Sequence, residues 1–441
     1  MKPVALRSCA LLVMAAVALT GCAGSYYDTM SGVQQAAQRG DYQRADALLS
    51  QQQDLTEGRN RLLYLLDKAL LAHLNQQYAE SNRWFTEAAA RIEQLEVTSI
   101  TGTVSEWLIN DSTQPYKGED FEQVLAHYYM ALNYLMLHNL EDALVECRRL
   151  NSLLRSFNDR YDNKNVYKTD AFSLYLSGLL YEARGATNDA LIDYRQAYNA
   201  YLTDYQENYG TAAPAQLLEH ILRTAAALGF RDVVETYRKE FPGATWPTQE
   251  AYRNAARLVV IWDNGLIPYK AQRIYREFIP LEEHKDKDKG CYVKLAFPEF
   301  VPRPPRFTRA TVSVNGQTAT LELAEDLAQI AVKNLEDRRV RTVVKAVARN
   351  AIKCLAEHEL DQRNAILGWL FAGLTEITEQ ADTRSWLLLP ANIQITELLL
   401  PPGVADVELS LTDISGQVTT QQYKALTFEK DKTTFLLHRT F

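Results

Sequence analysis

The chain has 441 residues, a net charge of −8 at pH 7 and 47% hydrophobic residues. This length exceeds what a single hydrophobic core usually organises, so more than one domain is expected. The acidic balance argues against nucleic-acid binding, which favours a basic surface.

The N-terminus has the pattern of a secretory signal peptide. Lys2 and Arg7 give a positive start, and an apolar run from Cys9 to Leu19 follows. The run is shorter than the about 20 residues that span a bilayer. A charged start, a short apolar core and small residues at its end are typical of a cleaved signal.

The stretch Leu19-Thr20-Gly21-Cys22 closes this run and resembles the lipobox of bacterial lipoproteins. The resemblance implies cleavage before Cys22 and acylation of that cysteine, with an ordinary signal peptide and a chance cysteine as the alternative. Ala23, where an Asp would imply inner-membrane retention, implies the outer membrane, facing the periplasm. We expect residues 1–21 to be the signal peptide and residues 22–29 a lipidated tether.

Between residues 30 and 245 the sequence resembles a tetratricopeptide (TPR) repeat, whose period is about 34 residues. Gly40-Asp41-Tyr42 matches the turn of such a repeat, and further copies contain Ser81, Ala143 and Gly229. The clearest copy consists of Leu174, Gly178, Tyr181, Gly185, Ala190, Tyr194 and Ala197. These intervals predict an all-α solenoid of paired helices, an architecture that binds other proteins on its concave side.

Two polar insertions interrupt the repeats, at about 95–121 and 155–169. They are either loops that cap the solenoid or a binding surface, because repeat proteins place insertions on one face. On the second interpretation, Tyr116 and Tyr161 are candidate partner-binding residues. The Gly and the distal Glu of a calcium-binding loop are missing from the second insertion.

From about residue 250 to residue 441 the pattern changes to short strands. It predicts a mixed α/β domain with an antiparallel β-sandwich-like sheet and a helical insertion at about 324–357. Asn315-Gly316 predicts a type I′ hairpin turn. The expected strands are Arg257–Trp262, Val293–Phe297, Thr311–Val314, Gln317–Leu323, Trp386–Leu389, Ile393–Leu400, Val407–Leu411, Val418–Lys424 and Thr433–Arg439.

The helical insertion carries a basic stripe, namely Arg341, Lys345, Arg349 and Lys353. Steps of four residues place these side chains along one side of a helix. The stripe is either a solvated face, with Asp337 pairing Arg341 at i,i+4, or a docking face for an acidic partner or an anionic glycan.

The sequence shows no familiar catalytic or cofactor-binding pattern. It contains no Gly-rich phosphate loop, no G-x-S-x-G elbow and no Cys/His spacing typical of a metal site. Cys147, Cys291 and Cys354 are expected to be buried apolar residues, with a Cys291–Cys354 disulfide as the alternative. We therefore expect a protein that is not an enzyme, with no catalytic residue, no cofactor and no metal.

Several motifs together resemble an uncharacterised family of bacterial TPR-containing outer-membrane lipoproteins. They are Pro115–Asp120, Asp263–Pro268, Phe297–Phe300, Pro302–Phe307, Glu379–Trp386 and Leu400–Gly403. The resemblance implies no reaction. Members of that family are encoded near small lipoproteins similar to activators of penicillin-binding proteins, which implies a role in the cell envelope.

These observations favour a protein–protein interaction scaffold or adaptor in cell-envelope assembly or maintenance. Its expected partners are the membrane, through the lipid, and a protein of the envelope-assembly machinery, whereas nucleic acid is not expected. The alternative is a peptidoglycan- or glycan-binding regulator of cell-wall synthesis, and an enzyme such as a glycan hydrolase is the third interpretation.

Overall fold

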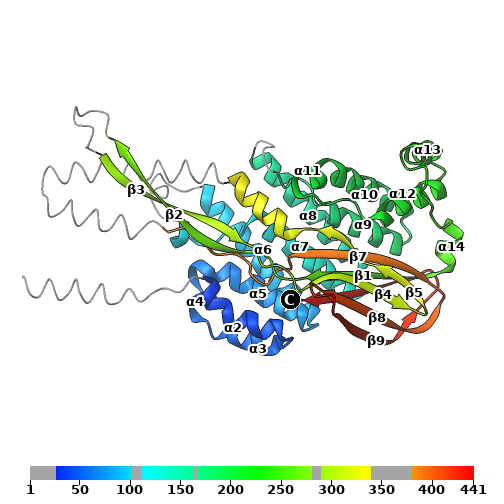
Figure 1. The fold of residues 1–441 in the computed structure, drawn as a ribbon, viewed down its shortest axis with the longest axis horizontal. Helices are drawn as coiled ribbons and strands as arrows, with labels where there is room; N and C mark the ends of the chain where they lie inside the picture. Colours follow the sequence, from blue (N-terminus) through cyan, green and yellow to red (C-terminus); the bar gives the residue numbers. More distant parts are fainter. Residues whose placement is uncertain (1–25, 101–110, 162–165, 281–289, 339–379) are drawn as a thin grey trace, which may run out of the picture.

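The computed structural model describes residues 26–100, 111–161, 166–280, 290–338 and 380–441. Helices occupy the described chain up to Asn254, and strands begin at Ala256 (Figure 1). The fold is α+β, with an N-terminal helical-repeat region followed by a mixed region of β-sheets, as the sequence predicts.

The described part of the helical region contains five pairs of antiparallel helices stacked one after another. The pairs are α2 (Tyr26–Gln38) with α3 (Tyr42–Ser50), α5 (Arg61–Leu74) with α6 (Tyr78–Ile100), α7 (Asp120–Met136) with α8 (Leu140–Arg160), α9 (Ala171–Ala183) with α10 (Thr187–Ala200), and α12 (Ala215–Leu228) with α13 (Arg231–Glu240). Shorter segments are α4 (Gln53–Thr56), η1 (Gly58–Asn60), η3 (Asp111–Thr113), η4 (Tyr201–Tyr205), α11 (Gln206–Tyr209) and α14 (Gln249–Asn254).

Local chemistry sets the boundaries of these helices. The side chains of Asp41, Asn139 and Asp170 accept hydrogen bonds from backbone N–H groups in the first turns of α3, α8 and α9. Such N-caps satisfy donors that the helix itself leaves free. Gly40 has φ +76°, a left-handed conformation that glycine adopts without strain, so the chain reverses between α2 and α3.

Helix α2 begins at Tyr26, inside the range 22–29 that the sequence assigns to a tether. The Tyr26 side chain is 7% exposed, and its hydroxyl donates to Oδ2 of Asp67 on α5 at 3.1 Å. Burial of an aromatic ring and this hydrogen bond hold the start of α2 against the next helix pair, so residues 26–29 belong to the folded region.

In the second half, the described residues form two four-stranded sheets and a separate hairpin. The strands are β1 (Ala256–Asn264), β2 (Tyr269–Pro280), β3 (Gly290–Val301), β4 (Phe307–Val314), β5 (Gln317–Thr320), β6 (Glu322–Glu325), β7 (Asn392–Leu400), β8 (Gly403–Asp413), β9 (Val418–Phe428) and β10 (Thr433–Thr440). The orders are β10-β1-β7-β6 and β5-β4-β8-β9, and among the described strands β2 pairs only with β3. At the β4–β5 turn, Asn315 and Gly316 have φ values of +50° and +81°, which confirms the predicted type I′ geometry.

Strand β1 lies in the middle of three layers. Val259 and Ile261 belong to the core shared with the helices, whereas Leu258, Val260 and Trp262 belong to the core between the two four-stranded sheets. A strand that is buried on both faces has a nearly continuous run of apolar residues in its sequence, and β1 has such a run. The helices, the β1 sheet and the β4 sheet are therefore stacked in that order.

Three expectations for the second half need correction. Strand β10 runs parallel to β1, so the first sheet is mixed and not purely antiparallel. Residues 386–389 form a turn region and not a strand, and β2 was not anticipated. Of the helical insertion predicted at about 324–357, residues 324 and 325 belong instead to β6, residues 327–338 are helical, and residues 339–357 lie outside the described residues.

Candidate interaction surfaces

The side of the solenoid formed by α5, α7 and α9 is occupied by the protein's own chain. Helix α7 has 14 buried residues among its 17, and α9 has 11 among its 13. A helix buried on nearly all sides has neighbours on more than one face. The outer helices cover one face, and the β1 sheet with the segment from Ala381 to Ala391 covers the other.

Trp386 is the main anchor of that segment. Its side chain is fully buried and packs edge-on against the rings of Phe85 and Tyr129, with centroids 5.9 and 6.0 Å away. Its backbone N–H donates to Oε1 of Glu122 on α7 at 2.7 Å. The side of the solenoid that the sequence predicts as a partner-binding groove is therefore covered by the Trp386 segment of the same chain.

A charged cluster fixes the base of the β2–β3 hairpin to α7. Glu119, which precedes α7, forms ion pairs with Lys270 on β2 and with Arg338 at the end of the described helical residues 327–338. Burial alone would raise the pKa of Glu119, but the two cations lower it to about 2. Glu119 is thus held ionised between elements that are distant in sequence.

A second buried network joins α9, α12 and β7. Arg223 is 1% exposed and donates to both carboxylate oxygens of Glu182 at 2.7 and 2.5 Å. Its guanidinium lies 3.4 Å from the ring centroid of Tyr252, whose hydroxyl donates to Glu397. Although burial opposes ionisation of Glu182, hydrogen bonds from His220 and Arg223 and the charge of Arg223 depress its pKa strongly. Because the network is buried and internally paired, it acts as a structural clamp.

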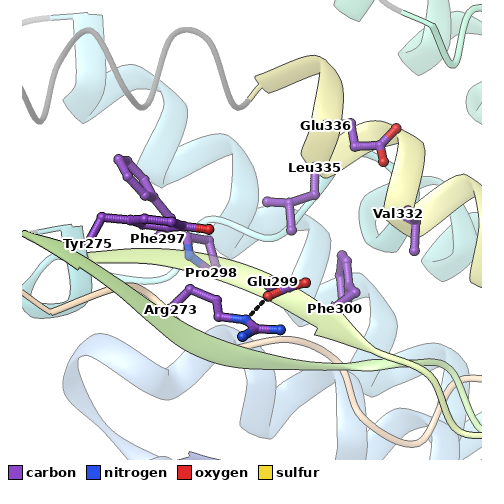
Figure 2. Close-up of a pocket in the computed structure, with 9 residues that line it drawn as sticks. All are labelled: Arg273, Tyr275, Phe297, Pro298, Glu299, Phe300, Val332, Leu335 and Glu336. Carbon is purple, nitrogen blue, oxygen red and sulfur yellow. Dashed lines mark hydrogen bonds and ion pairs between the residues drawn. The ribbon is translucent and has the colours of Figure 1, made fainter. Parts of the chain in front are cut away.

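A cleft with a largely apolar lining lies between the β2–β3 hairpin and the helical residues 327–338 (Figure 2). Its volume is about 210 Å³. The lining residues are Arg273, Tyr275, Phe297, Pro298, Glu299, Phe300, Val332, Leu335 and Glu336. Figure 2 shows Leu335 pointing from the helix towards the hairpin, and an ion pair between Arg273 and Glu299 across the two strands.

The hairpin presents unusual apolar exposure. Ile274 is 48% exposed and Tyr275 is 47% exposed, at adjacent positions of β2. Successive side chains of a strand point to opposite faces, so both faces of the hairpin carry a large exposed apolar group. A two-stranded ribbon without further strands is marginally stable alone, and exposed apolar surface on such an element is typical of an interaction site. We call the cleft, with Tyr275 in its lining, the hairpin cleft.

The residues proposed from sequence lie in different environments. Tyr116 is 5% exposed, and its hydroxyl donates to Oε2 of Glu122 at 2.6 Å, so it cannot offer a surface to a partner as expected. Tyr161 is partly buried, and its hydroxyl lies 3.5 Å from Oδ1 of Asp120. The structure does not bring these two tyrosines into one exposed patch. Cys22 and the basic stripe of Arg341, Lys345, Arg349 and Lys353 lie outside the described residues.

The sequence does not predict the hairpin cleft, because the residues that line it come from segments far apart in the chain. Strand β2 (Tyr269–Pro280) mixes charged and aromatic residues, with no clean alternation of apolar and polar positions. A signal was available in the runs Ile274-Tyr275 and Phe278-Ile279, since aromatic and β-branched residues favour strands. Which of these side chains are exposed depends on how the base of the β2–β3 hairpin packs on α7, and the sequence of β2 does not indicate that packing.

The described residues show neither a candidate metal site nor a helix able to span a membrane. They contain no group of three or more His, Cys, Asp or Glu side chains arranged to hold a metal ion. None of the described helices combines the length and the apolar character that crossing a membrane requires. Cys147 is buried and not in a disulfide, whereas the Cys291–Cys354 alternative is not tested because Cys354 lies outside the described residues.

Comparisons with known proteins give distant likenesses only. No family model matches the chain, and no curated protein is similar to it. Among solved structures, the apo form of RapI is 12% identical over 49% of this chain and 68% of its own, with a TM-score of 0.34. MamA is 14% identical over 47% of this chain and 91% of its own, with a TM-score of 0.29. TPR-like repeats of a Podosopora anserina putative kinesin light chain are 15% identical over 48% of this chain and 91% of theirs, with a TM-score of 0.31.

Proposed function

We propose that this protein is a lipid-anchored scaffold that holds a partner protein at the periplasmic face of the outer membrane. The lipid on Cys22 supplies the location, and the folded body supplies the docking surface. Its role is in cell-envelope assembly or maintenance, in line with the family resemblance of the sequence. The stacked helix pairs support a binding role because such solenoids build extended surfaces.

The observation that carries this proposal is the hairpin cleft. Since the α5, α7 and α9 side of the solenoid is filled by the Trp386 segment, a partner is directed to another surface. The hairpin cleft combines exposed Tyr275 with a hollow lined by Phe297 and Phe300, and Ile274 exposes a further apolar side chain on the opposite face of the hairpin. Protein interfaces are enriched in such aromatic residues at their centre.

Lipid anchoring adds a physical advantage to this arrangement. Each buried CH₂ group of an acyl chain contributes about 0.8 kcal/mol to membrane binding, so several chains hold the protein firmly. A surface fixed close to one membrane meets a partner in that membrane at a high effective concentration. Modest affinity at the hairpin cleft would therefore be sufficient.

In-cell crosslinking tests the docking surface. A photoreactive phenylalanine analogue at Tyr275 should capture one defined protein, identified by mass spectrometry. The same analogue at Leu202, which is 52% exposed on the π-helical segment η4, is the matched control and should not capture it. If the analogue at position 275 captures no protein while the protein binds to purified cell-wall sacculi, the scaffold proposal is contradicted and the glycan-binding alternative is supported. Release of sacculus fragments by the pure protein would contradict both.

The anchor is tested separately. The Cys22→Ser variant should lose incorporation of radiolabelled palmitate and should move from the membrane fraction to the soluble periplasmic fraction. Unchanged membrane fractionation of this variant would contradict a lipid anchor at Cys22.

A further inference from the structure

Strand β10, drawn in red in Figure 1, forms one edge of the β1 sheet. Its parallel register places Phe435, Leu437 and Arg439 beside Val259, Ile261 and Asp263, so these side chains face the helices. Phe435 and Leu437 are only partly buried. In the described part of the chain no strand pairs with the outer edge of β10, so that edge can accept another extended chain.

Two hollows follow each other along β10, between this strand, β9 and the tips of the helix pairs. The first has a volume of about 270 Å³ and includes Tyr42, Tyr78, Gln421 and Arg439 in its lining. The second has a volume of about 500 Å³. Its lining includes Leu135, Met136, Leu426 and Phe435. We call the two hollows together the β10 groove, which is polar at its Arg439 end and apolar at its Phe435 end.

No described carboxylate forms an ion pair with Arg439, although the charges of Arg439 and Asp263 lie close enough to influence each other. Its hydrogen bonds go to backbone carbonyls, among them those of Asp263, Gly265 and Leu388 at 3.1, 2.6 and 3.1 Å. Its Nε has no hydrogen-bond partner in the described structure. The nearby carboxylate of Asp263 accepts instead from the hydroxyls of Tyr129 and Tyr128, at 2.8 and 3.3 Å.

We propose that the β10 groove binds an extended segment of a partner protein, with an acidic group at the Arg439 end and apolar side chains at the Phe435 end. The segment would add to the free edge of β10 through main-chain hydrogen bonds, a common mode of peptide recognition. A strand advances about 3.3 Å per residue. The acidic group and the apolar side chains are therefore expected about four to six residues apart. This surface is distinct from the hairpin cleft, so either can fail without the other.

Selection from a displayed library of random octapeptides on the full-length mature protein tests the proposal. We expect enrichment of Asp or Glu four to six residues from Leu, Phe or Val. Replacing the selected acid by Asn in the peptide should weaken binding to the wild-type protein at least about tenfold, as lost charge complementarity predicts. Because that change is made in the peptide, it leaves the fold of the protein untouched.

A pair of variants on β9 locates the binding site. Gln421 lines the Arg439 end of the groove, whereas Gln422 is its neighbour on the opposite face, beside Glu408. Gln421→Glu should weaken binding of the selected peptide at least about tenfold by like-charge repulsion. Gln422→Glu should leave the affinity for the peptide unchanged, although the new charge opposite Glu408 lowers the melting temperature of that variant.

Three results would overturn the proposal: no selected peptides, selected peptides without the acidic and apolar pattern, or equal affinities for the two variants. A concentration-dependent dimer that the selected peptides fail to disrupt would instead assign the groove to a second copy of this chain.

Discussion

At the scale of single residues, Gly178 lets α9 and α10 approach closely. A Cβ at this position would lie 2.3 Å from Cε1 of Tyr194, whose ring is fully buried. The Tyr194 hydroxyl donates to Glu182, so the ring cannot easily move aside. We expect Gly178→Ala to lower the free energy of unfolding by about 1–3 kcal/mol, as overpacked cores do, measured by urea denaturation.

Gly32 on α2 is the matched control for that substitution. An added Cβ would meet only Cδ1 of Leu48, at 3.9 Å, which is an ordinary contact. Alanine is favoured over glycine within a helix by up to about 1 kcal/mol. Gly32→Ala should therefore leave stability unchanged or raise it. Equal losses at the two positions would mean that the close contact with Tyr194 is not the cause.

His438 makes stability depend on pH. Burial and the nearby charge of Arg439 lower its pKa from 6.5 to about 4. Between these values the unfolded chain binds a proton that the folded chain does not, so the stabilising contribution of neutral His438 is present above pH 6.5 and is lost as the pH falls.

Replacing His438 removes this linkage. When the pH is lowered from 7 to 5, the wild type loses stability through His438 and the His438→Gln variant does not. The free energy of unfolding of the variant minus that of the wild type should therefore increase by about 2 kcal/mol. Urea unfolding of both proteins at each pH measures the difference. A relative stability that is the same at both pH values would show that His438 titrates alike in the folded and unfolded chains.

At the scale of elements, the segment Trp386–Leu389 shows why an apolar run is not always a strand. All four side chains are buried, as in a central strand, yet the backbone has no partner strand. Its carbonyl groups are satisfied by other donors: Leu387 accepts from Arg303, Leu388 from Arg439, and Leu389 from the backbone N–H of Ile267. Arginine side chains here replace part of a β-ladder, which no local pattern indicates.

The helix pairs differ in how firmly the rest of the protein holds them. None of the residues of α13 is buried, whereas 11 of the 13 residues of α9 are. Elements with few buried contacts open at a smaller cost in free energy. We expect backbone amides of α13 to exchange with deuterium much faster than those of α9 in native-state hydrogen exchange. Similar protection in both helices would show that α13 opens only with the whole fold.

At the scale of the whole molecule, the helical and sheet regions share one core. Tyr129 on α7 and Phe172 on α9 belong to the same buried cluster as Val259 on β1 and Trp386. The hydroxyl of Tyr201 donates to the carbonyl of Ala324 at 2.8 Å, and that of Tyr205 to Glu325 at 2.9 Å. The helices are thus completed by residues from the second half of the chain.

This shared core predicts that the helical region does not fold independently. A fragment of residues 26–245 would expose the faces of α7 and α9 that the β1 sheet covers. It should lack a cooperative thermal transition and near-ultraviolet circular dichroism, while the full chain unfolds in a single transition. A cooperative transition of the fragment alone would establish the helical region as an independent domain.

The candidate site was less predictable than the fold. Tyr116 lies in a polar insertion, which suggested exposure, but its hydroxyl reaches the buried carboxylate of Glu122 and the ring is covered. The hairpin cleft joins Tyr275, Phe297 and Leu335, and no local rule indicates that these residues meet. Interaction surfaces depend on contacts between distant segments, which a single sequence does not display.

Features that depend on neighbouring residues can be predicted from the amino-acid sequence alone. The helix pairs, the N-cap at Asp41 and the type I′ turn at Asn315-Gly316 follow from periodicity, side-chain capping and permitted φ angles. By contrast, the packing of the Trp386 segment against the solenoid and the parallel pairing of β10 with β1 depend on contacts between distant parts of the chain. Those outcomes depend on which apolar surfaces and buried polar groups satisfy one another across the whole chain, and that choice is made by packing, not by local preference.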